Sequence, residues 1–201
     1  MLPRRSAERA VSEARERLEK MVLPLSKYGE KVLREKSVPV SCVTAELSAL
    51  AEDMVETMHE TGGVGLAAQQ VFRTERLCVI DIPEGCEEDE DRLFNAPISM
   101  PLKLFNPQIL SREGVQCDKE GCLSFPGING EIVRAHQVVC SYIDENNVPQ
   151  TITARGFLAR AIQHEVDHLD GVLFIDRMTA PTRLRCATKL KKLAKANGGV
   201  R

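Results

Sequence analysis

Residues 157–171 read FLARAIQHEVDHLDG, a largely apolar run that leads into two histidines. His164 and His168 are four residues apart, so on a helix they lie about one turn apart on one face, and both imidazoles can bind one metal ion. Glu165 is rotated by roughly 100° from His164, where its carboxylate can act on a water molecule at that ion without being a ligand. The stretch predicts a buried helix that carries a site for metal-assisted hydrolysis.

The other residues of this stretch predict how the helix packs. Phe157 and Ala161 continue the histidine stripe at helical spacing, and Gly171 is a helix stop signal. Because a mostly apolar helix is a buried helix, two histidines and a glutamate within it would be costly without a partner such as a metal ion. The residues expected to pack away from the histidines are Leu158, Ile162, Val166 and Leu169.

A catalytic site of this kind needs a third protein ligand and one open position. Familiar HExxH proteases take that ligand from downstream, either as a histidine six residues after the second motif histidine or as a later glutamate. Here Phe174 occupies the histidine position, no His follows His168, and no Glu follows Glu165. Asp170 or Asp176 could serve, as in rarer aspartate-zinc proteases. Otherwise the ligand must lie upstream.

The chain has seven cysteines at irregular spacing, with no secretory segment before them. This usage predicts reduced thiols and a cytoplasmic location. Cys78 and Cys140 lie in predicted strands, where packing in the core is the expected role. Cys122 differs, because it stands in the sequence EGCLS at 120–124, next to turn-forming residues. Cys122 is therefore the upstream candidate for the third ligand.

Three separated motifs resemble those of the peptide deformylase family. They are GVGLAAQQ at 63–70, EGCLS at 120–124 and QHEVDHLDG at 163–171, in the family's order. The resemblance extends from about Leu23 to Arg177, and Gln69 occupies a slot where proline is common. It implies a metal-dependent hydrolase that removes the formyl group from the N-terminal N-formylmethionine of newly synthesised proteins and releases formate.

The resemblance also implies the metal ligands, which would be Cys122, His164 and His168. Ferrous iron is the expected ion, and Zn²⁺, Ni²⁺ or Co²⁺ can occupy the same donors. One thiolate and two imidazoles suit several divalent ions, so the residues alone do not choose among them.

Three further residues have catalytic roles implied by the resemblance. Glu165 would accept a proton from the attacking water and return it to the departing amine. The side-chain amide of Gln70 and the backbone N–H of Leu123 would stabilise the negative oxygen of the tetrahedral intermediate. The substrates of the enzyme would be N-formylmethionyl peptides and nascent chains.

Substrate binding is assigned from the same motifs. Glycines in the first motif allow an extended peptide to approach closely and to pair with the chain's backbone. Arg160 is unusual for an apolar pocket, and we expect its stem to pack while its charged head reaches water. Glu120 and Arg134 are expected to form a salt bridge that orients the cysteine loop. The predicted substrate-binding residues are Val64, Gly65, Gly121, Phe157, Arg160 and Ala161.

The remaining pattern predicts an α+β fold, with mainly antiparallel β-sheets packed around the buried C-terminal helix that carries HExxH. A helix is expected to follow a Thr44 cap and to reach about His59. Strands are expected at 77–82 and 102–106, with a solvated acidic loop at 83–91. Residues 137–144 and 148–154 alternate in polarity and predict a hairpin.

Length predicts one domain. The resemblance implies that its catalytic part extends over 21–180, because residues 21–25 resemble the usual start of a deformylase. A charged helical extension is expected at 1–20 and a basic tail at 181–201. With 43% apolar residues, 28% charged residues and a net charge of −2, the chain requires neither nucleic-acid readout nor an anionic membrane. It contains no apolar run long enough for a membrane span.

The basic tail from Thr182 onward carries seven Lys or Arg residues and no acidic ones. A solvated terminal helix is the simpler interpretation, with a partial apolar stripe. The family resemblance suggests instead a contact with the ribosome. The stripe is predicted to consist of Leu184, Ala187, Leu190 and Ala194.

Two alternatives to a deformylase are open at this point. An endopeptidase would use Asp170 or Asp176 as its third ligand. A catalytically silent descendant would only bind formylated or acetylated N-termini, although the intact Glu165 and Gln70 argue against it.

Overall fold

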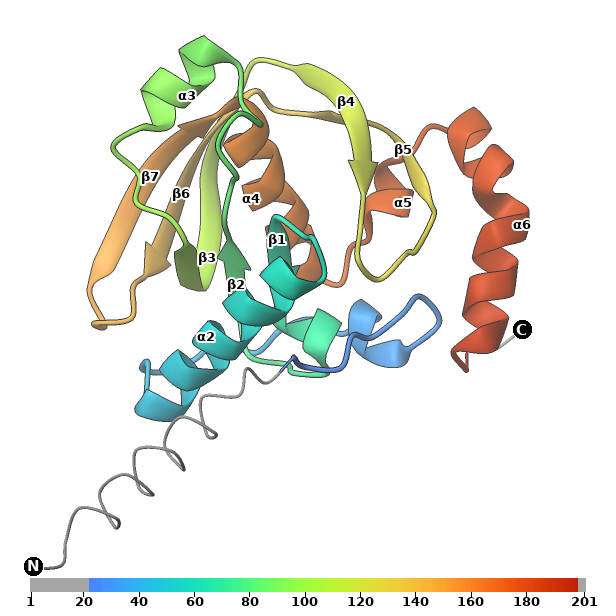
Figure 1. Ribbon diagram of the computed structural model, residues 1–201, viewed down its shortest axis with the longest axis horizontal. Helices are drawn as coiled ribbons and strands as arrows, with labels where there is room; N and C mark the ends of the chain where they lie inside the picture. Colours follow the sequence, from blue (N-terminus) through green and yellow to red (C-terminus); the bar gives the residue numbers. More distant parts are fainter. Residues whose placement is uncertain (1–21, 199–201) are drawn as a thin grey trace, which may run out of the picture.

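The computed structural model describes residues 22–198, and the extension predicted at 1–20 lies outside the described residues. A five-stranded antiparallel sheet has the order β1-β2-β3-β6-β7, and β4 and β5 form a separate two-stranded sheet (Figure 1). The α+β prediction is confirmed. The elements are η1 (Lys31–Arg34), α2 (Ala45–Glu60), β1 (Gly65–Ala67), η2 (Ala68–Val71), β2 (Leu77–Ile80), α3 (Asp89–Asn95), β3 (Leu102–Glu113), β4 (Gln116–Gly121), β5 (Asn129–Arg134), β6 (Gln137–Ile143), β7 (Pro149–Arg155), α4 (Gly156–Leu169), α5 (Phe174–Arg177) and α6 (Ala180–Ala196).

Strands β1 and β2 of the large sheet lie between α2 and α4, and β2 shows why. Side chains alternate across a strand, so Leu77 and Val79 pack into the cluster formed with α2. Cys78 and Ile80 point the other way, into the cluster formed with α4. All four residues of β2 are buried. Helix α4 is thus supported along its length by a sheet with apolar residues on both faces.

Helix α4 buries the face that the sequence predicted. Leu158, Ile162, Val166 and Leu169 all belong to the cluster against the sheet, so this prediction is confirmed. The helix ends at Leu169, and Gly171 follows with a φ of 72°. A Cβ at Gly171 would lie 2.6 Å from the carbonyl oxygen of Arg34, so the stop also depends on the absence of a side chain.

The N-terminus of α4 is capped by the acidic segment, which the sequence reading placed wholly in solvent. Oε1 of Glu87 accepts hydrogen bonds from the backbone N–H of Leu158 at 3.3 Å and from Nδ2 of Asn95 at 2.7 Å. Asn95 also bonds both backbone groups of Arg155, and Asp91 is only 8% exposed. Residues 83–86 and 88–90 are exposed, as predicted. The prediction of a solvated loop at 83–91 is wrong for Glu87 and Asp91, and α3 begins at Asp89. The physical reason is that carboxylates satisfy the unpaired N–H groups and the positive end of a helix.

Helix α2 and the β6–β7 hairpin match their predictions closely. The Thr44 side chain accepts a hydrogen bond from the N–H of Leu47 at 3.3 Å, which caps α2. Strand β3 is much longer than the predicted 102–106, because its outer half pairs with β6. Strand β2 ends at Ile80, two residues before the predicted end.

Strands β4 and β5 pack with α5 and α6 around a third apolar cluster, which contains Phe125, Ile132, Phe174 and Leu190. The predicted terminal helix is present as α6, but the prediction of its apolar face is partly wrong. Leu184 is 76% exposed, and the helix packs instead through Cys186, Leu190 and Leu193. Among residues 22–198, every helix is too short or too polar to cross a bilayer.

Candidate metal centre and active site

A cavity of about 510 Å³ lies between the loop before β1, the loop from β4 to β5, and helix α4. Every predicted site residue except His168 lines it. His168 is 1% exposed and lies beside the cavity through its contact with Cys122. Three motifs that are far apart in the sequence therefore meet at one place.

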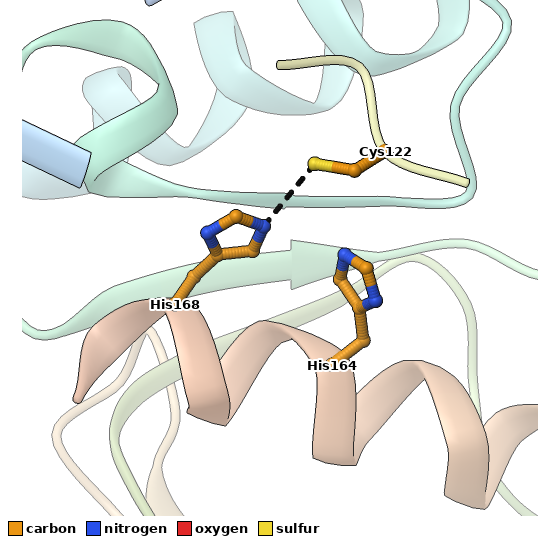
Figure 2. A group of neighbouring side chains, drawn as sticks. All are labelled: Cys122, His164 and His168. Carbon is orange, nitrogen blue, oxygen red and sulfur yellow. Dashed lines mark hydrogen bonds between the residues drawn. The ribbon is translucent and has the colours of Figure 1, made fainter. Parts of the chain in front are cut away.

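Three metal-donor side chains converge in this region. Figure 2 shows His164 and His168 projecting from α4 towards Cys122, which comes from the loop after β4. Their donor atoms all lie within 4.8 Å of one another, and Sγ of Cys122 is 3.3 Å from Nε2 of His168. Within residues 22–198 this is the one cluster of at least three His, Cys, Asp or Glu side chains with metal-ligand spacing.

The aspartates of the endopeptidase alternative lie elsewhere. Asp170 accepts a hydrogen bond from Nη1 of Arg76 at 2.8 Å. Asp176 forms an ion pair with Arg34 and caps the N–H of Leu173. Neither carboxylate belongs to the donor group. The geometry therefore favours the upstream cysteine.

The donor atoms have the chemistry that a divalent cation requires. Nδ1 of His164 lies 3.0 Å from the Glu120 carboxylate, an arrangement that leaves Nε2 of the ring free to bind a metal. Burial opposes a charge on His164, but Cys122 and Glu120 outweigh it and raise the pKa to about 10. A cation between sulfur and imidazole would replace that proton. Burial, together with the charge on His164, lowers the pKa of His168 well below its usual value, so this ring is a neutral donor.

Glu120 is the centre of a buried charge network behind His164. Its carboxylate accepts hydrogen bonds from Nε of Arg134 at 2.6 Å and from Nη1 of Arg160 at 2.7 Å. Burial alone would raise the pKa of Glu120, but the bonds to His164 and Arg134 hold it at about 2. Arg134 also bonds Asp167 at 2.8 Å. The salt bridge expected between Glu120 and Arg134 is present.

Arg160 departs from its expected orientation. We expected its charged head to reach water, but the residue is 3% exposed, and its guanidinium bonds Glu120 and the carbonyl oxygen of Ile132. The cause is the buried carboxylate of Glu120, which needs cationic donors because a charge in the interior is costly without partners. Arg160 lines the cavity, as predicted, but as part of this network.

Glu165 lies deep in the cavity and faces β1. It is 4% exposed, its Oε2 atom has no hydrogen-bond partner among the described residues, and burial raises its pKa to about 7. A Cβ built on Gly65 would overlap this carboxylate and lie 2.8 Å from its Cδ. Gly65 thus makes room for Glu165. This role was not predicted from the sequence, where the glycine was expected to give the backbone conformational freedom and to let a substrate approach closely.

The Gln70 side chain is held with its donor group towards the cysteine loop. Oε1 accepts a hydrogen bond from the N–H of Ala67 at 2.9 Å, which directs Nε2 to Sγ of Cys122 at 3.4 Å and to Oγ of Ser124 at 3.3 Å. Gln69 points away and bonds the carbonyl oxygen of Glu35. These positions favour Gln70 over Gln69 as the functional amide. Ser124 was not singled out from the sequence.

Apolar side chains cover one wall of the cavity. Val64, Phe157 and Ala161 line it as expected, and Phe125 and Ile128 join them from the β4–β5 loop. The last two were missed, although their apolar character just after EGCLS in a short loop was a usable signal. This wall can receive an apolar side chain beside the donor group.

A thiol and two imidazoles at metal-ligand spacing, with a buried carboxylate and an oriented amide over the same cavity, define the site of a metal-dependent hydrolase. A family model described as polypeptide deformylase matches residues 22–184. The chain belongs to the peptide deformylase family.

Peptide deformylases among the curated relatives and the solved structures are similar to this chain over most of its length. A peptide deformylase of Desulfitobacterium hafniense is 40% identical over 162 residues, which cover 81% of this chain and 98% of the relative. One of Opitutus terrae is 43% identical, covering 87% of this chain and 94% of the relative. The crystal structure of the Thermus thermophilus peptide deformylase has a TM-score of 0.75 at 36% identity, covering 88% of this chain and 99% of that one. A Synechococcus elongatus deformylase in complex with actinonin has a TM-score of 0.71 at 39% identity, covering 90% and 92%.

The activity follows from the family. The chain is a metal-dependent hydrolase that removes the formyl group from the N-terminal formylmethionine of newly synthesised proteins and releases formate. Its substrates are formylmethionyl nascent peptides.

Proposed function

We propose that Cys122, His164 and His168 hold one ferrous ion and that Glu165 is the acid–base residue of deformylation. The observation that carries this proposal is the convergence of the three donors within 4.8 Å, next to the cavity lined by Glu165. Ferrous iron is the ion expected for the family, and Zn²⁺, Ni²⁺ or Co²⁺ suit the same donors. When bound, the ion would polarise the formyl oxygen and lower the pKa of water, so that the water loses a proton readily and becomes a nucleophile.

Glu165 would then transfer a proton from the attacking water to the departing amine. Glu165 accepts it from the attacking water as the new C–O bond forms at the formyl carbon. Glu165 next donates it to the nitrogen of methionine as the C–N bond breaks, so formate and a free N-terminus leave. The carboxylate suits both steps because one oxygen is free of hydrogen-bond partners among the described residues and the side chain is shielded from bulk water.

Gln70 and Leu123 would stabilise the negative charge that develops on the formyl oxygen. Gln70 and Leu123 both line the cavity. Gln70 would donate through its side-chain amide and Leu123 through its backbone N–H. Donors held in place before reaction stabilise a developing oxyanion strongly, because a site shielded from water does not reorganise during the step. Gln70 is held in this way by the N–H of Ala67.

The substrate backbone would pair with strand β1. Among residues 22–198 this strand pairs with β2 alone, so its other edge can bind an extended peptide, apart from the Ala67 N–H that is bonded to Gln70. Gly65 and Gly121 line the cavity and let the peptide approach closely, and Val64, Phe157 and Ala161 would receive the methionine side chain. Recognition through main-chain bonds tolerates many sequences beyond the first residue, as a substrate set of nascent chains requires.

Anaerobic purification followed by metal analysis and a formate-release assay tests this assignment. We expect about one iron per chain and stoichiometric formate from a formyl-Met-Ala-Ser peptide. The acetylated peptide is the control and should give no acetate. Iron-free protein that carries only zinc at full activity would overturn the ferrous assignment, and binding of both peptides without release would support the silent-descendant alternative.

We further propose that the exposed basic face of α6 contacts the ribosome, and that the protein works in the cytoplasm. Lys191, Lys192 and Lys195 are exposed, whereas Leu190 of the same helix is buried against the catalytic body. Deleting the tail would therefore uncover the core, and charge reversal is the cleaner test.

Changing Lys191, Lys192 and Lys195 together to glutamate should weaken co-sedimentation with ribosomes in low salt, because the phosphate backbone attracts cations. Activity on a short formyl peptide should stay unchanged. Reversing Lys31 and Lys36, which are exposed outside α6, is the matched control. Co-sedimentation that is equal for both variants would remove the proposal.

A further inference from the structure

Residues Ser26, Lys27 and Tyr28 lie outside the three family motifs but contact two of them. We call these residues the bridging segment. It lies close to the start of the described chain and runs between η2, which carries Gln70, and the loop after β4, which carries Leu123. It therefore joins the two elements that hold the proposed oxyanion donors.

The first end of the bridging segment fixes η2. The backbone N–H of Ser26 donates to the carbonyl oxygen of Gln70 at 2.8 Å. The Ser26 hydroxyl donates to the carbonyl oxygen of Gln69 at 2.9 Å. Ser26 is fully buried, so both bonds are shielded from water. Together they hold the backbone from which the Gln70 side chain projects.

The second end holds two successive peptide units of the cysteine loop through their carbonyl groups. Nζ of Lys27 donates to the carbonyl oxygen of Leu123 at 2.9 Å, and the N–H of Tyr28 donates to the carbonyl oxygen of Ser124 at 2.9 Å. The Tyr28 ring stacks on Phe125 with centroids 4.8 Å apart. Two successive carbonyl groups after Cys122 are thereby anchored to one neighbouring segment.

The Lys27 ammonium binds the carbonyl oxygen of Leu123 rather than a carboxylate. Among residues 22–198 it has no carboxylate within ion-pair distance, and Glu30 bonds the backbone N–H of Lys27 instead, at 3.1 Å. Lys27 does not line the cavity, so it acts on the reaction only through Leu123. A charged donor on a backbone carbonyl makes a stronger bond than a neutral one.

We propose that Lys27 is a positioning residue for deformylation. The Leu123 N–H belongs to the peptide unit of the Cys122 carbonyl, which accepts a hydrogen bond from the N–H of Phe125 at 2.8 Å. Lys27 holds the next peptide unit through the Leu123 carbonyl, so the two bonds together fix Leu123 relative to the Gln70 amide. This inference rests on the donor roles proposed for Gln70 and Leu123. The negative oxygen exists only once the tetrahedral intermediate begins to form. Misplacing its donor therefore lowers kcat and leaves the binding of the neutral formyl group unchanged.

The test compares Lys27→Met with Lys27→Arg, using the full chain loaded with metal and a formyl-Met-Ala-Ser peptide. Loss of one oxyanion donor typically costs about a hundredfold or more in kcat, so a displaced donor should cost about tenfold in Lys27→Met. KM, metal content and the visible spectrum of the Co²⁺-substituted protein should not change, because the ligands are untouched. Lys27→Arg should recover most of the loss, since it restores a cationic donor.

Lys36→Met is the matched control, because Lys36 is exposed and lies in the same N-terminal region. If Lys27→Met does not fold, Lys27→Gln keeps a shorter polar side chain, and Ser26→Ala removes only the hydroxyl bond to Gln69. Both should lower kcat without changing KM. A change in KM alone, or kcat unchanged in Lys27→Met, would overturn the positioning role.

Gln70→Ala separates this inference from the proposal beneath it. A large loss of kcat in Gln70→Ala, with wild-type kcat in Lys27→Met, would refute only the role of the bridging segment. Wild-type kcat in Gln70→Ala would refute the oxyanion assignment itself.

Discussion

Replacing Glu165 by glutamine should leave the protein folded and its metal bound, while the rate of formate release falls by about three orders of magnitude. Glu165 lies beside the donor group and is not one of its members, so the ion keeps all three ligands. Glutamine has nearly the same shape but cannot accept the proton of the attacking water. The fold should tolerate the change, because Oε2 of Glu165 has no hydrogen-bond partner to lose among residues 22–198.

The measurement is kcat for a formyl-Met peptide together with metal content per chain. Glu131→Gln is the control, because Glu131 is exposed on β5 and does not line the cavity. It should behave as wild type in both respects. A Glu165→Gln protein that retains metal and turns over at the wild-type rate would refute the acid–base assignment.

Replacing Cys122 by alanine should abolish stable metal binding, and activity with it. Altering a mere hydrogen-bond partner of a ligand typically weakens metal binding about 10–100-fold, so loss of one ligand out of three should exceed that. The substitution also removes the sulfur that Nε2 of Gln70 contacts at 3.4 Å. The check is metal content after dialysis, with the melting temperature confirming that the chain is folded.

Two other variants make this result specific. Cys117 is exposed on β4, and Cys117→Ala should keep the metal. Asp176→Asn should also keep it, although the ion pair with Arg34 is lost. Metal retained in Cys122→Ala but lost in Asp176→Asn would instead favour the aspartate-dependent endopeptidase.

The elements that could be predicted from the sequence are those whose pattern is local. Helix α4 has an apolar stripe and a terminal glycine, and α2 has a threonine cap, so their type and approximate ends follow from neighbouring residues. Strand β3 was predicted too short, because its outer half is stabilised by pairing with β6 rather than by its own alternation. The helix α3 was missed because its last residue, Asn95, is held by the backbone of Arg155 at the end of β7, which is distant in sequence.

The site shows the same division. The two histidines and Glu165 follow from helical spacing, whereas Cys122 required the family resemblance, since no spacing rule joins a loop cysteine to a helix more than 40 residues away. The burial of Arg160 could not be foreseen, because it depends on a carboxylate from β4. The roles of Ser124 and of the segment 26–28 depend on contacts across the fold and leave no trace in the local pattern.

The capping of α4 by the acidic segment has a practical consequence. Residues 83–95 are rich in acidic residues, and from sequence alone they resemble an exposed loop that would tolerate insertions. Here such an edit would remove Glu87 and Asn95 from the first turn of the helix that presents His164 and His168. Surface redesign of this enzyme should therefore leave Glu87 and Asn95 in place.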